Sequence, residues 1–378
     1  MKTENAGTPI MYKQWTAPLL IAMLLVIRAE SAAQVEPPVS RDTVVVGRLT
    51  LTGYPYVFYN PEVEFAAGGA LVVTSYLDAS AEAKPSNVIL TGWASTNSSY
   101  LLALTPEFFL SSDRIYVLLA LRYSRYADRF WGIGPTSEDT IDAGYARKGF
   151  SLSGEVDVAV WGALKVGLNY ELNNTRVTDQ GSNPLLTSGA VTASDGGFTS
   201  GLGAVFLLDT RNGAFYPTSG GLYKLSFLNT SRFLGSEFLL NRWILDLRQY
   251  FALSDPVVLA VQAYASAVSG EAPFYMLPAL GGGKIMRGYF EGRYRDRMLV
   301  TLQGEVRVRL FGRWGVAGWV GVGDVAHSAR SFTLRTAKPS FGVGVRFALD
   351  PTELLNIRVD VAKGRESDGI YFDAKEAF

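Results

Sequence analysis

The sequence contains no cysteine and a single histidine, His327. The absence of cysteine excludes disulfide bonds, thiolate metal ligands and cysteine nucleophiles, and it is compatible with an oxidising compartment. Basic and acidic residues number 35 each, so the formal net charge is +0. A chain without excess positive charge has no general attraction for nucleic acid. We therefore expect no nucleic-acid partner, no cofactor and no metal site.

The sequence also lacks a long apolar run. After residue 33 no stretch reaches 18 uninterrupted apolar residues, so we predict no transmembrane helix in the mature chain. The first 33 residues are different, because basic residues precede an apolar run from Ala17 to Ile27 that is too short to span a bilayer. Small residues at Ser31-Ala32-Ala33 follow. We predict a signal peptide over residues 1–33 and a short periplasmic linker over residues 34–48.

What the sequence does have is a side-chain period of two. Between Val300 and Leu310, apolar residues alternate with polar ones that include Glu305. This alternation predicts a β-strand with one apolar and one ionic face. The pattern recurs along the chain, and no helical segment remains to cover the apolar faces. The sequence therefore predicts an all-β fold, a transmembrane antiparallel β-barrel over residues 49–378 whose outward side chains face lipid.

Turn residues divide this region into about 16 strands, an even number as single-chain bacterial barrels require. The predicted strands are 49–59, 62–76, 86–96, 99–110, 113–124, 145–158, 161–173, 198–210, 220–231, 238–252, 257–269, 297–311, 314–325, 338–349, 354–363 and 369–378. The long connections then all fall on one side, near 125–144, 174–197, 270–296 and 326–337. Since such barrels have long extracellular loops and short periplasmic turns, we assign this side to the exterior.

One candidate motif lies at a predicted periplasmic turn, between residues 209 and 220. Asp209 and Arg211 are two residues apart on one strand face, while Pro217 and Gly220 favour a turn into the next strand. Taken alone, this pattern also fits an ordinary turn with a local ion pair.

A second motif follows in the longest predicted loop, where Gly281-Gly282 precedes Arg287-Gly288-Tyr289 and the next strand carries Glu305. The two motifs together resemble the bacterial surface antigen superfamily, the outer-membrane assembly factors of BamA/TamA type. The resemblance covers roughly residues 45–378 and is strongest in about the last 180 residues.

The resemblance implies that the long extracellular loop folds into the lumen and that Arg287 meets the inward-facing Glu305. It also matches Asp324 to an aspartate of the family's next strand, although Ala326 stands where the family usually has glycine. An unpaired guanidinium would be costly in a partly dry lumen, whereas a paired one can hold a loop. We expect a loop lock formed by Arg287, Gly288, Tyr289, Glu305 and Asp324. The alternative is a solvated extracellular basic loop.

The last predicted strand, 369–378, has an apolar row of Ile370, Phe372, Ala374 and Phe378, interrupted by Glu376. This row resembles the C-terminal recognition strand of outer-membrane barrels, which implies contact with the barrel assembly machinery through strand addition.

The family resemblance implies a location in the outer membrane of a Gram-negative-type bacterium, with membrane lipid as surroundings. It also implies insertion or translocation of client outer-membrane proteins at a weak seam between the first and last strands. About 15 residues separate Ala33 from the first strand, too few for the family's periplasmic repeat domains, so a separate periplasmic-domain protein is an expected partner.

Two other functions stay open. One is a passive pore or structural barrel without insertase activity. The other is a barrel-embedded hydrolase that would use His327 with Ser328 or Ser331, although no nucleophile motif surrounds them. We expect that the protein is not an enzyme.

Overall fold

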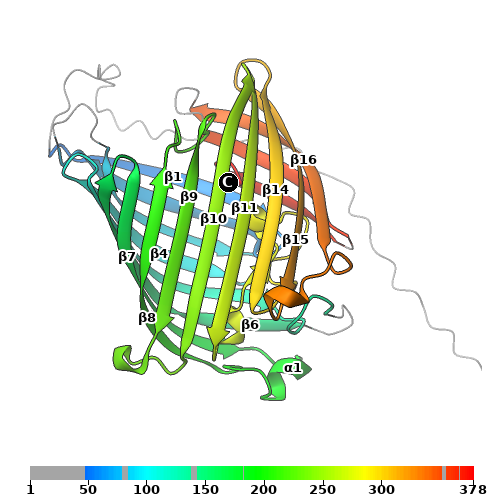
Figure 1. The fold of residues 1–378 in the computed structure, drawn as a ribbon. Helices are drawn as coiled ribbons and strands as arrows, with labels where there is room; N and C mark the ends of the chain where they lie inside the picture. The colour runs from blue at the N-terminus through cyan, green and yellow to red at the C-terminus, as the bar shows by residue number, and fades with distance from the viewer. Residues whose placement is uncertain (1–46, 79–83, 138–142, 182, 351–354, 366) are drawn as a thin grey trace, which may run out of the picture. The chain divides into compact units, whose positions relative to one another are not determined.

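The computed structural model describes residues 47–78, 84–137, 143–181, 183–350, 355–365 and 367–378. The predicted signal peptide and most of the predicted linker lie outside these residues, so both stay predictions. From Gly47 onward the described chain forms a closed antiparallel barrel (Figure 1). Among the described residues, no helix is long and apolar enough to cross a bilayer.

Sixteen strands close the barrel, and each pairs with its neighbours in chain order. They are β1 (Thr50–Asn60), β2 (Glu64–Ser75), β3 (Ser86–Ser95), β4 (Tyr100–Leu110), β5 (Ile115–Arg129), β6 (Gly144–Trp161), β7 (Leu164–Thr178), β8 (Gly196–Asp209), β9 (Gly220–Thr230), β10 (Leu240–Ser254), β11 (Val257–Gly270), β14 (Met298–Arg309), β15 (Trp314–Ala326), β16 (Lys338–Asp350), β17 (Leu355–Lys363) and β18 (Asp368–Ala374). The predicted fold class and strand number are confirmed.

The two remaining strands belong to the long connection between β11 and β14. Within it, β12 (Ala279–Leu280) pairs with β13 (Tyr294–Arg295), and the one-turn helix α2 (Gly282–Ile285) lies between them. The only other α-helical turn of the described chain is α1 (Pro184–Thr187), in the connection between β7 and β8.

The alternation predicted from the sequence is observed in the barrel wall, where apolar side chains point outward and charged side chains point into the lumen. In β14, Val300, Leu302 and Val306 are exposed, while Glu305 and Arg307 are fully buried. β17 repeats the pattern. Because a charged residue on the lipid face near mid-bilayer costs about 2–4 kcal/mol, these rows fix the register of the strands.

The sequence leaves the faces of β15 ambiguous, since both are rich in glycine and apolar residues. The structure places Trp319 on the inner face, where it is buried, and Val320 on the outer face. The indole fills the space left by Gly342 on the neighbouring strand, where a Cβ atom would lie 2.2 Å from the ring.

The long connections lie at one end of the barrel, the lower end in Figure 1, where α1 is found. They join β5 to β6, β7 to β8, β11 to β14 and β15 to β16. The strands bordering the first two are longer than predicted, since the ladder of β5 and β6 continues to Arg129 and Gly144. Beyond the hydrophobic alternation, polar and aromatic residues of the two strands stay opposite each other, such as Tyr126 with Arg147.

Candidate functional site

The inner face of the last five barrel strands carries a cluster of charged side chains. β14 contributes Glu305 and Arg307, β16 contributes Arg346, and β17 contributes Arg358 and Asp360, all buried. Their positions follow from the period of two, which points alternate residues of each strand into the lumen. Buried ionised groups are costly unless each is paired and hydrogen-bonded, and the contacts below satisfy most of them.

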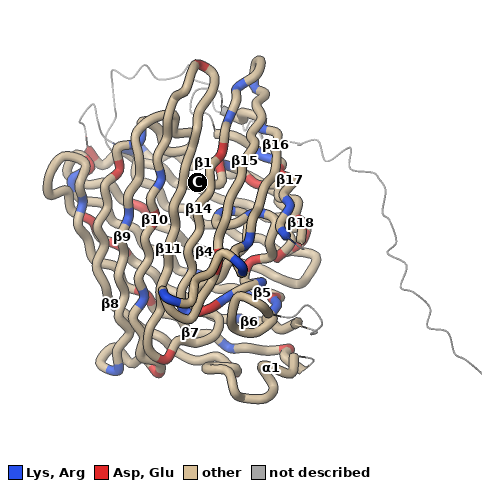
Figure 2. The backbone as a smooth tube through the Cα atoms, turned by 45° about the vertical axis from the view of Figure 1, so that its right-hand side comes forward, with Lys and Arg blue, Asp and Glu red and all other residues tan. Residues whose placement is uncertain are grey.

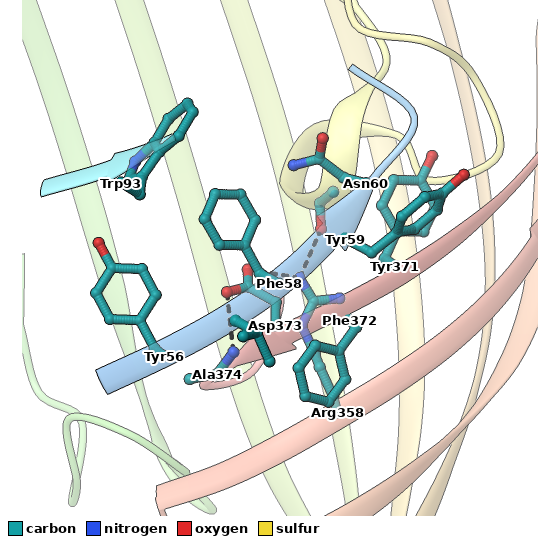
Figure 3. A pocket seen from close by; sticks show the side chains of 12 residues that line it. Tyr56, Phe58, Tyr59, Asn60, Trp93, Arg358, Tyr371, Phe372, Asp373 and Ala374 are labelled. Atoms are coloured by element: carbon teal, nitrogen blue, oxygen red, sulfur yellow. Dashed lines mark hydrogen bonds and ion pairs between the residues drawn. The ribbon is translucent and has the colours of Figure 1, made fainter. Parts of the chain in front are cut away.

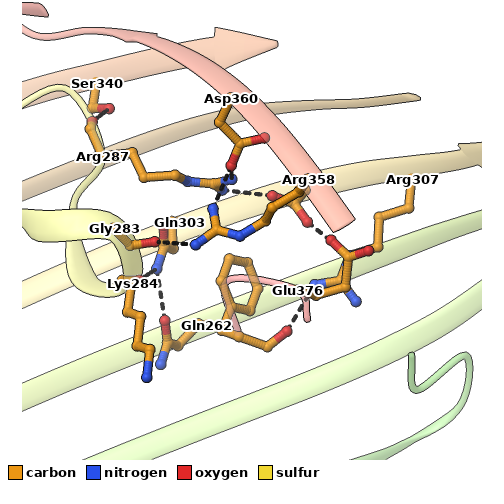
Figure 4. A network of polar contacts seen from close by, with 12 residues as sticks. Gln262, Gly283, Lys284, Arg287, Gln303, Arg307, Ser340, Arg358, Asp360 and Glu376 are labelled. Carbon is orange, nitrogen blue, oxygen red and sulfur yellow. Dashed lines mark hydrogen bonds and ion pairs between the residues drawn. The ribbon is translucent and has the colours of Figure 1, made fainter. Parts of the chain in front are cut away.

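Arg287 enters this cluster from the connection between β11 and β14. Its Nη2 donates to Glu305 Oε2 at 2.5 Å and its Nη1 donates to Asp360 Oδ2 at 2.7 Å (Figure 4). Its Cζ atom lies 3.6 Å from the ring centre of Trp319, a cation–π contact. The side chain is completely buried. Its charge is paired with two carboxylates, and its planar face stacks on the indole.

The cluster continues away from Arg287 through shared carboxylates. Arg307 Nε donates to the second oxygen of Glu305 at 2.7 Å, and Arg346 Nη1 donates to Asp360 Oδ1 at 2.5 Å. Arg358 Nη1 also donates to Asp360. Each carboxylate therefore joins at least two guanidinium groups, which links the loop to β14, β16 and β17.

Position 288 requires glycine, both because of its backbone conformation and because of the atoms that surround it. Its φ of +97° favours glycine, and a Cβ atom there would lie 2.9 Å from the backbone nitrogen of Gly364. Its N–H donates to the hydroxyl of Tyr371 on β18 at 3.0 Å. The loop thus contacts the strand that closes the barrel.

Tyr289 is buried between the loop and the ends of β16 and β17. Its hydroxyl donates to the carbonyl of Pro339 at 2.7 Å and accepts from the backbone nitrogen of Arg365 at 2.8 Å. The ring lies over Gly364, where a Cβ atom would be 2.6 Å from it.

The backbone of the loop is held from the wall as well. Gln303 donates to the carbonyl of Lys284 at 2.8 Å, Arg358 donates to that of Gly283 at 3.1 Å, and Ser340 donates to that of Arg287.

Asp324, which we expected in the same lock, lies elsewhere. Its carboxylate accepts from Lys338 Nζ at 2.7 Å and from Thr336 Oγ1 at 2.5 Å, and no contact with Arg287 is recorded in the described part of the chain. Asp324 lies near the long-connection end of β15, five positions beyond Trp319, the residue that stacks on Arg287. Among the described residues Asp324 therefore pairs with Lys338 and not with Arg287, and its part in the lock stays a prediction.

The turn between β8 and β9 has the geometry of its sequence motif. Arg211 donates to both carboxylate oxygens of Asp209, from Nε at 2.9 Å and from Nη2 at 2.8 Å. Gly220 has a φ of +80°, and a Cβ atom there would lie 2.0 Å from the carbonyl oxygen of Thr210. Pro217 is buried within the turn. The motif therefore shapes a closed turn.

Sequence reasoning missed what this turn presents to the lumen. Tyr216 is buried, and the Cζ atom of Arg307 lies 5.7 Å from its ring centre. Phe215 lies 5.1 Å from Lys375 Nζ. In the sequence, the two adjacent aromatic residues between Gly213 and Pro217 were the feature that could have indicated these contacts.

The chain end differs from the predicted strand. β18 ends at Ala374, and Lys375 has a φ of +69° that turns the chain inward. Ile370 on β18 is exposed as expected, but Phe378 is buried, packed with Tyr250 and Ala260. The outward orientation expected for Phe378 is wrong.

Polar contacts hold this inward segment, residues 375–378. Glu376 accepts from Arg346 Nε and from Asn356 Nδ2, both at 2.8 Å. Arg307 Nη2 donates to the carbonyl of Phe378 at 2.7 Å. Glu376, which interrupts the apolar row, therefore has partners in the lumen, and these explain why it turns away from lipid.

The seam between β1 and β18 is the least paired boundary of the barrel. The two strands share a single register pair, Tyr59 with Phe372, whereas β1 pairs with β2 over its whole length. A cavity of about 260 Å³ lies beside this pair, lined by residues that include Tyr56, Arg358 and Asp373 (Figure 3).

Three residues after Tyr59 of the seam pair, Glu62 lies in the turn from β1 to β2. Its Oε1 accepts from the backbone nitrogen of Glu291 in the long loop at 2.8 Å. Burial raises the pKa of Glu62 to about 7, and the charges of Glu291 and Asp128 act in the same direction, while hydrogen bonds from the backbone oppose the shift.

The residues of the hydrolase alternative do not form a catalytic arrangement. His327 is 74% exposed at its side chain, with Nδ1 3.9 Å from Asp296 Oδ1. Ser328 and Ser331 hydrogen-bond to each other at 2.8 Å. Among the described residues, no group of three or more His, Asp or Glu side chains could hold a metal ion.

Together, the closed barrel, its apolar exterior and its ionic interior define an integral membrane barrel. The Omp85 superfamily domain matches residues 91–378. The chain belongs to this superfamily, whose members are outer-membrane β-barrel proteins of Gram-negative bacteria. No curated protein matches the sequence.

Solved structures share the fold. BamA from Haemophilus ducreyi lacking POTRA domains 1–3 superposes with a TM-score of 0.61 at 14% identity, over 87% of this chain and 70% of that one. CdiB from Acinetobacter baumannii gives 0.52 at 10% identity, over 88% and 65%. CdiB from Escherichia coli gives 0.54 at 13% identity, over 86% and 62%. The chain therefore spans less than two thirds of either CdiB chain.

Proposed function

We propose that this protein inserts or translocates other proteins at the outer membrane, and that the seam between β1 and β18 is where it acts. The observation that carries this proposal is the single register pair between Tyr59 and Phe372. In the described residues of the two strands, no other residue of β18 lies opposite β1 in register. Unpaired backbone groups on a strand edge can pair with an incoming strand.

The inward turn at Lys375 supports the same proposal. A ladder continued from Tyr59 and Phe372 would place Glu376 opposite Pro55 and Phe378 opposite Gly53. Residues 375–378 instead lie in the lumen, so this part of β1 keeps a free edge. Pro55 has no N–H to donate, which weakens the ladder that the turned residues would otherwise form.

In the mechanism that we propose, a client strand pairs with the free edge of β1 and separates Tyr59 from Phe372, while β18 stays attached to β17 along its length. The loop carrying Arg287, Gly288 and Tyr289 acts as a lock that holds β16, β17 and β18 together during this exchange. The contacts from Gly288 to Tyr371 and from Arg287 to Asp360 support this role.

A disulfide across the seam tests the proposal, because the chain has no native cysteine. We expect that oxidised Tyr59→Cys/Phe372→Cys no longer speeds the folding of a client barrel into vesicles, and that reduction restores this activity. The matched control is Leu245→Cys/Ala265→Cys, which joins two strands already paired in a full ladder. Undiminished activity of the oxidised seam variant would refute the proposal.

A passive pore is the second candidate, favoured by the wall opposite the charged cluster. There Lys224 Nζ and Glu155 Oε1 form an ion pair at 2.6 Å, and Arg242 pairs with Glu171, all partly exposed. A polar, partly exposed lumen is compatible with conduction. Steady single-channel conductance without any effect on client folding would favour the pore.

Partners and location follow from the same proposal. We propose an outer-membrane location, client outer-membrane proteins at the seam and a separate periplasmic-domain protein at the end where the β8–β9 turn lies. Recognition by the barrel assembly machinery would use the outward residues Ile370 and Phe372 of β18. Co-purification of a periplasmic-domain protein from envelope extracts would test the partner.

A further inference from the structure

We infer that the outer face of β14 to β17 binds one membrane lipid in a defined groove, with its acyl chain along the wall and its phosphate at the long-connection end. The groove has a volume of about 730 Å³, within the usual range of small-molecule sites. This inference is independent of the proposed function, since it concerns the outward side chains of β14 to β17 and not the pairing of β1 with β18.

The groove walls are apolar side chains on adjacent strands. They come from β14, β15, β16 and β17, and the most exposed are Val306, Val320, Phe341, Val343 and Val361. All point outward, toward the hydrocarbon that surrounds a membrane-spanning barrel. An acyl chain is therefore the matching occupant along the length of the groove.

Two outward glycines make the wall concave. A Cβ atom at Gly304 would meet nothing within 4 Å, and one at Gly318 would reach only a backbone oxygen at 3.9 Å. They lie on neighbouring strands, with Gly304 opposite Val320 and Val306 opposite Gly318. The gap therefore runs diagonally across two neighbouring strands.

The floor of the groove includes Trp319, which also lies against Arg287 on its lumenal face. Gly342 also lines the groove, and its missing side chain leaves room for the indole on the lumenal side of the wall.

Charge at the end of the groove selects the headgroup. Lys363 lines the groove as the last residue of β17. Arg365 follows in the turn, and its Nη2 donates to the carbonyl of Ala337 at 2.8 Å, which places the guanidinium beside the start of β16. Exposed Arg330 and Arg335 lie in the connection joining β15 to β16.

Acidic groups at this end are fewer among the described residues. Asp368 lines the groove opposite Lys363, and Asp324 is buried and paired with Lys338. An excess of exposed cations above an apolar groove matches a phosphate headgroup joined to an acyl chain.

The test is native mass spectrometry of the whole chain in detergent, titrated with phosphatidylglycerol and with diacylglycerol of the same acyl chains. We expect one tightly bound phosphatidylglycerol. The double substitution Gly304→Leu/Gly318→Leu fills the groove and should weaken the binding of phosphatidylglycerol by at least about tenfold. The open space at both positions lets this variant fold. The matched control, Gly92→Leu, adds the same side chain to an outward position of β3 opposite the exposed Leu102.

The headgroup is tested separately. The double substitution Lys363→Gln/Arg365→Gln should weaken the binding of phosphatidylglycerol severalfold and leave the binding of diacylglycerol unchanged. If the groove-filled variant binds phosphatidylglycerol as tightly as the parent chain, the site does not exist. If the charge variant weakens both lipids equally, or if the parent binds both equally well, phosphate recognition is wrong.

Discussion

Arg287 and Trp319 lie face to face inside the barrel, with the guanidinium carbon 3.6 Å from the centre of the indole. The edges of the same guanidinium donate to Glu305 and Asp360. A planar cation is thus stacked on one side and hydrogen-bonded at its ends, an arrangement that lysine cannot reproduce. The contact links a connection between strands to the inner wall of three strands near the seam.

The first prediction concerns this arginine. Arg287→Ala should lower the temperature at which the barrel loses its compact form on gels, because removing one partner of a buried pair costs about 3–5 kcal/mol. Arg287→Lys should fall between the parent and alanine, since it keeps the charge and loses the stacking. Arg335→Ala removes an exposed arginine as a control. Parent-like unfolding of both Arg287 variants would contradict the lock.

The second prediction concerns Gly288. Gly288→Val should destabilise the barrel, because the residue has a φ of +97° and a Cβ atom would approach the backbone of Gly364 to 2.9 Å. The same measurement on Gly304→Val provides the control, since that position is open. Equal heat resistance of the two variants would show that the close approach is unimportant.

The third prediction concerns the inward segment 375–378. Glu376→Val removes the contacts with Arg346 and Asn356 and makes the outward row of β18 continuous. The seam ladder should then extend, bringing Ala377 opposite Tyr54. Cysteines at these two positions should form a disulfide faster in the Glu376→Val background.

Lys375→Gly is the opposing variant, because glycine favours the positive φ that turns the chain inward. It should slow the same disulfide. If Glu376→Val does not accelerate the reaction, the ion pairs do not hold the segment in the lumen.

The fourth prediction concerns pH. Burial raises the pKa of Glu62 from 4.5 to about 7, so the folded protein binds this proton more tightly than the unfolded chain. Its contribution to stability is complete below pH 4.5 and is lost as pH rises to about 7. Glu62→Gln should flatten the pH dependence of thermal unfolding in this window and unfold at a higher temperature at pH 8. An unchanged pH profile would contradict the shift.

Much of the fold can be predicted from the sequence, because the alternation within each strand shows which side chains face lipid and which face the lumen. Alternation from Val300 to Leu310 predicts which side chains of β14 enter the lumen. The spacing of Asp209 and Arg211 predicts their ion pair, since residues two apart on a strand share a face. These features depend on local geometry and on the high cost of exposing charge to hydrocarbon.

Other features depend on which strands meet. The sequence does not say that Trp319 lies inward, because that choice rests on the space at Gly342 across the next ladder. It does not reveal that Asp324 pairs with Lys338, or that Glu376 turns to Arg346 and leaves β1 with one partner at the seam. The sequence by itself determined a lipid-facing barrel, because the period of two is a local property. Only the tertiary structure decided the ion pairs and the weak seam, because they depend on distances between residues far apart in the chain.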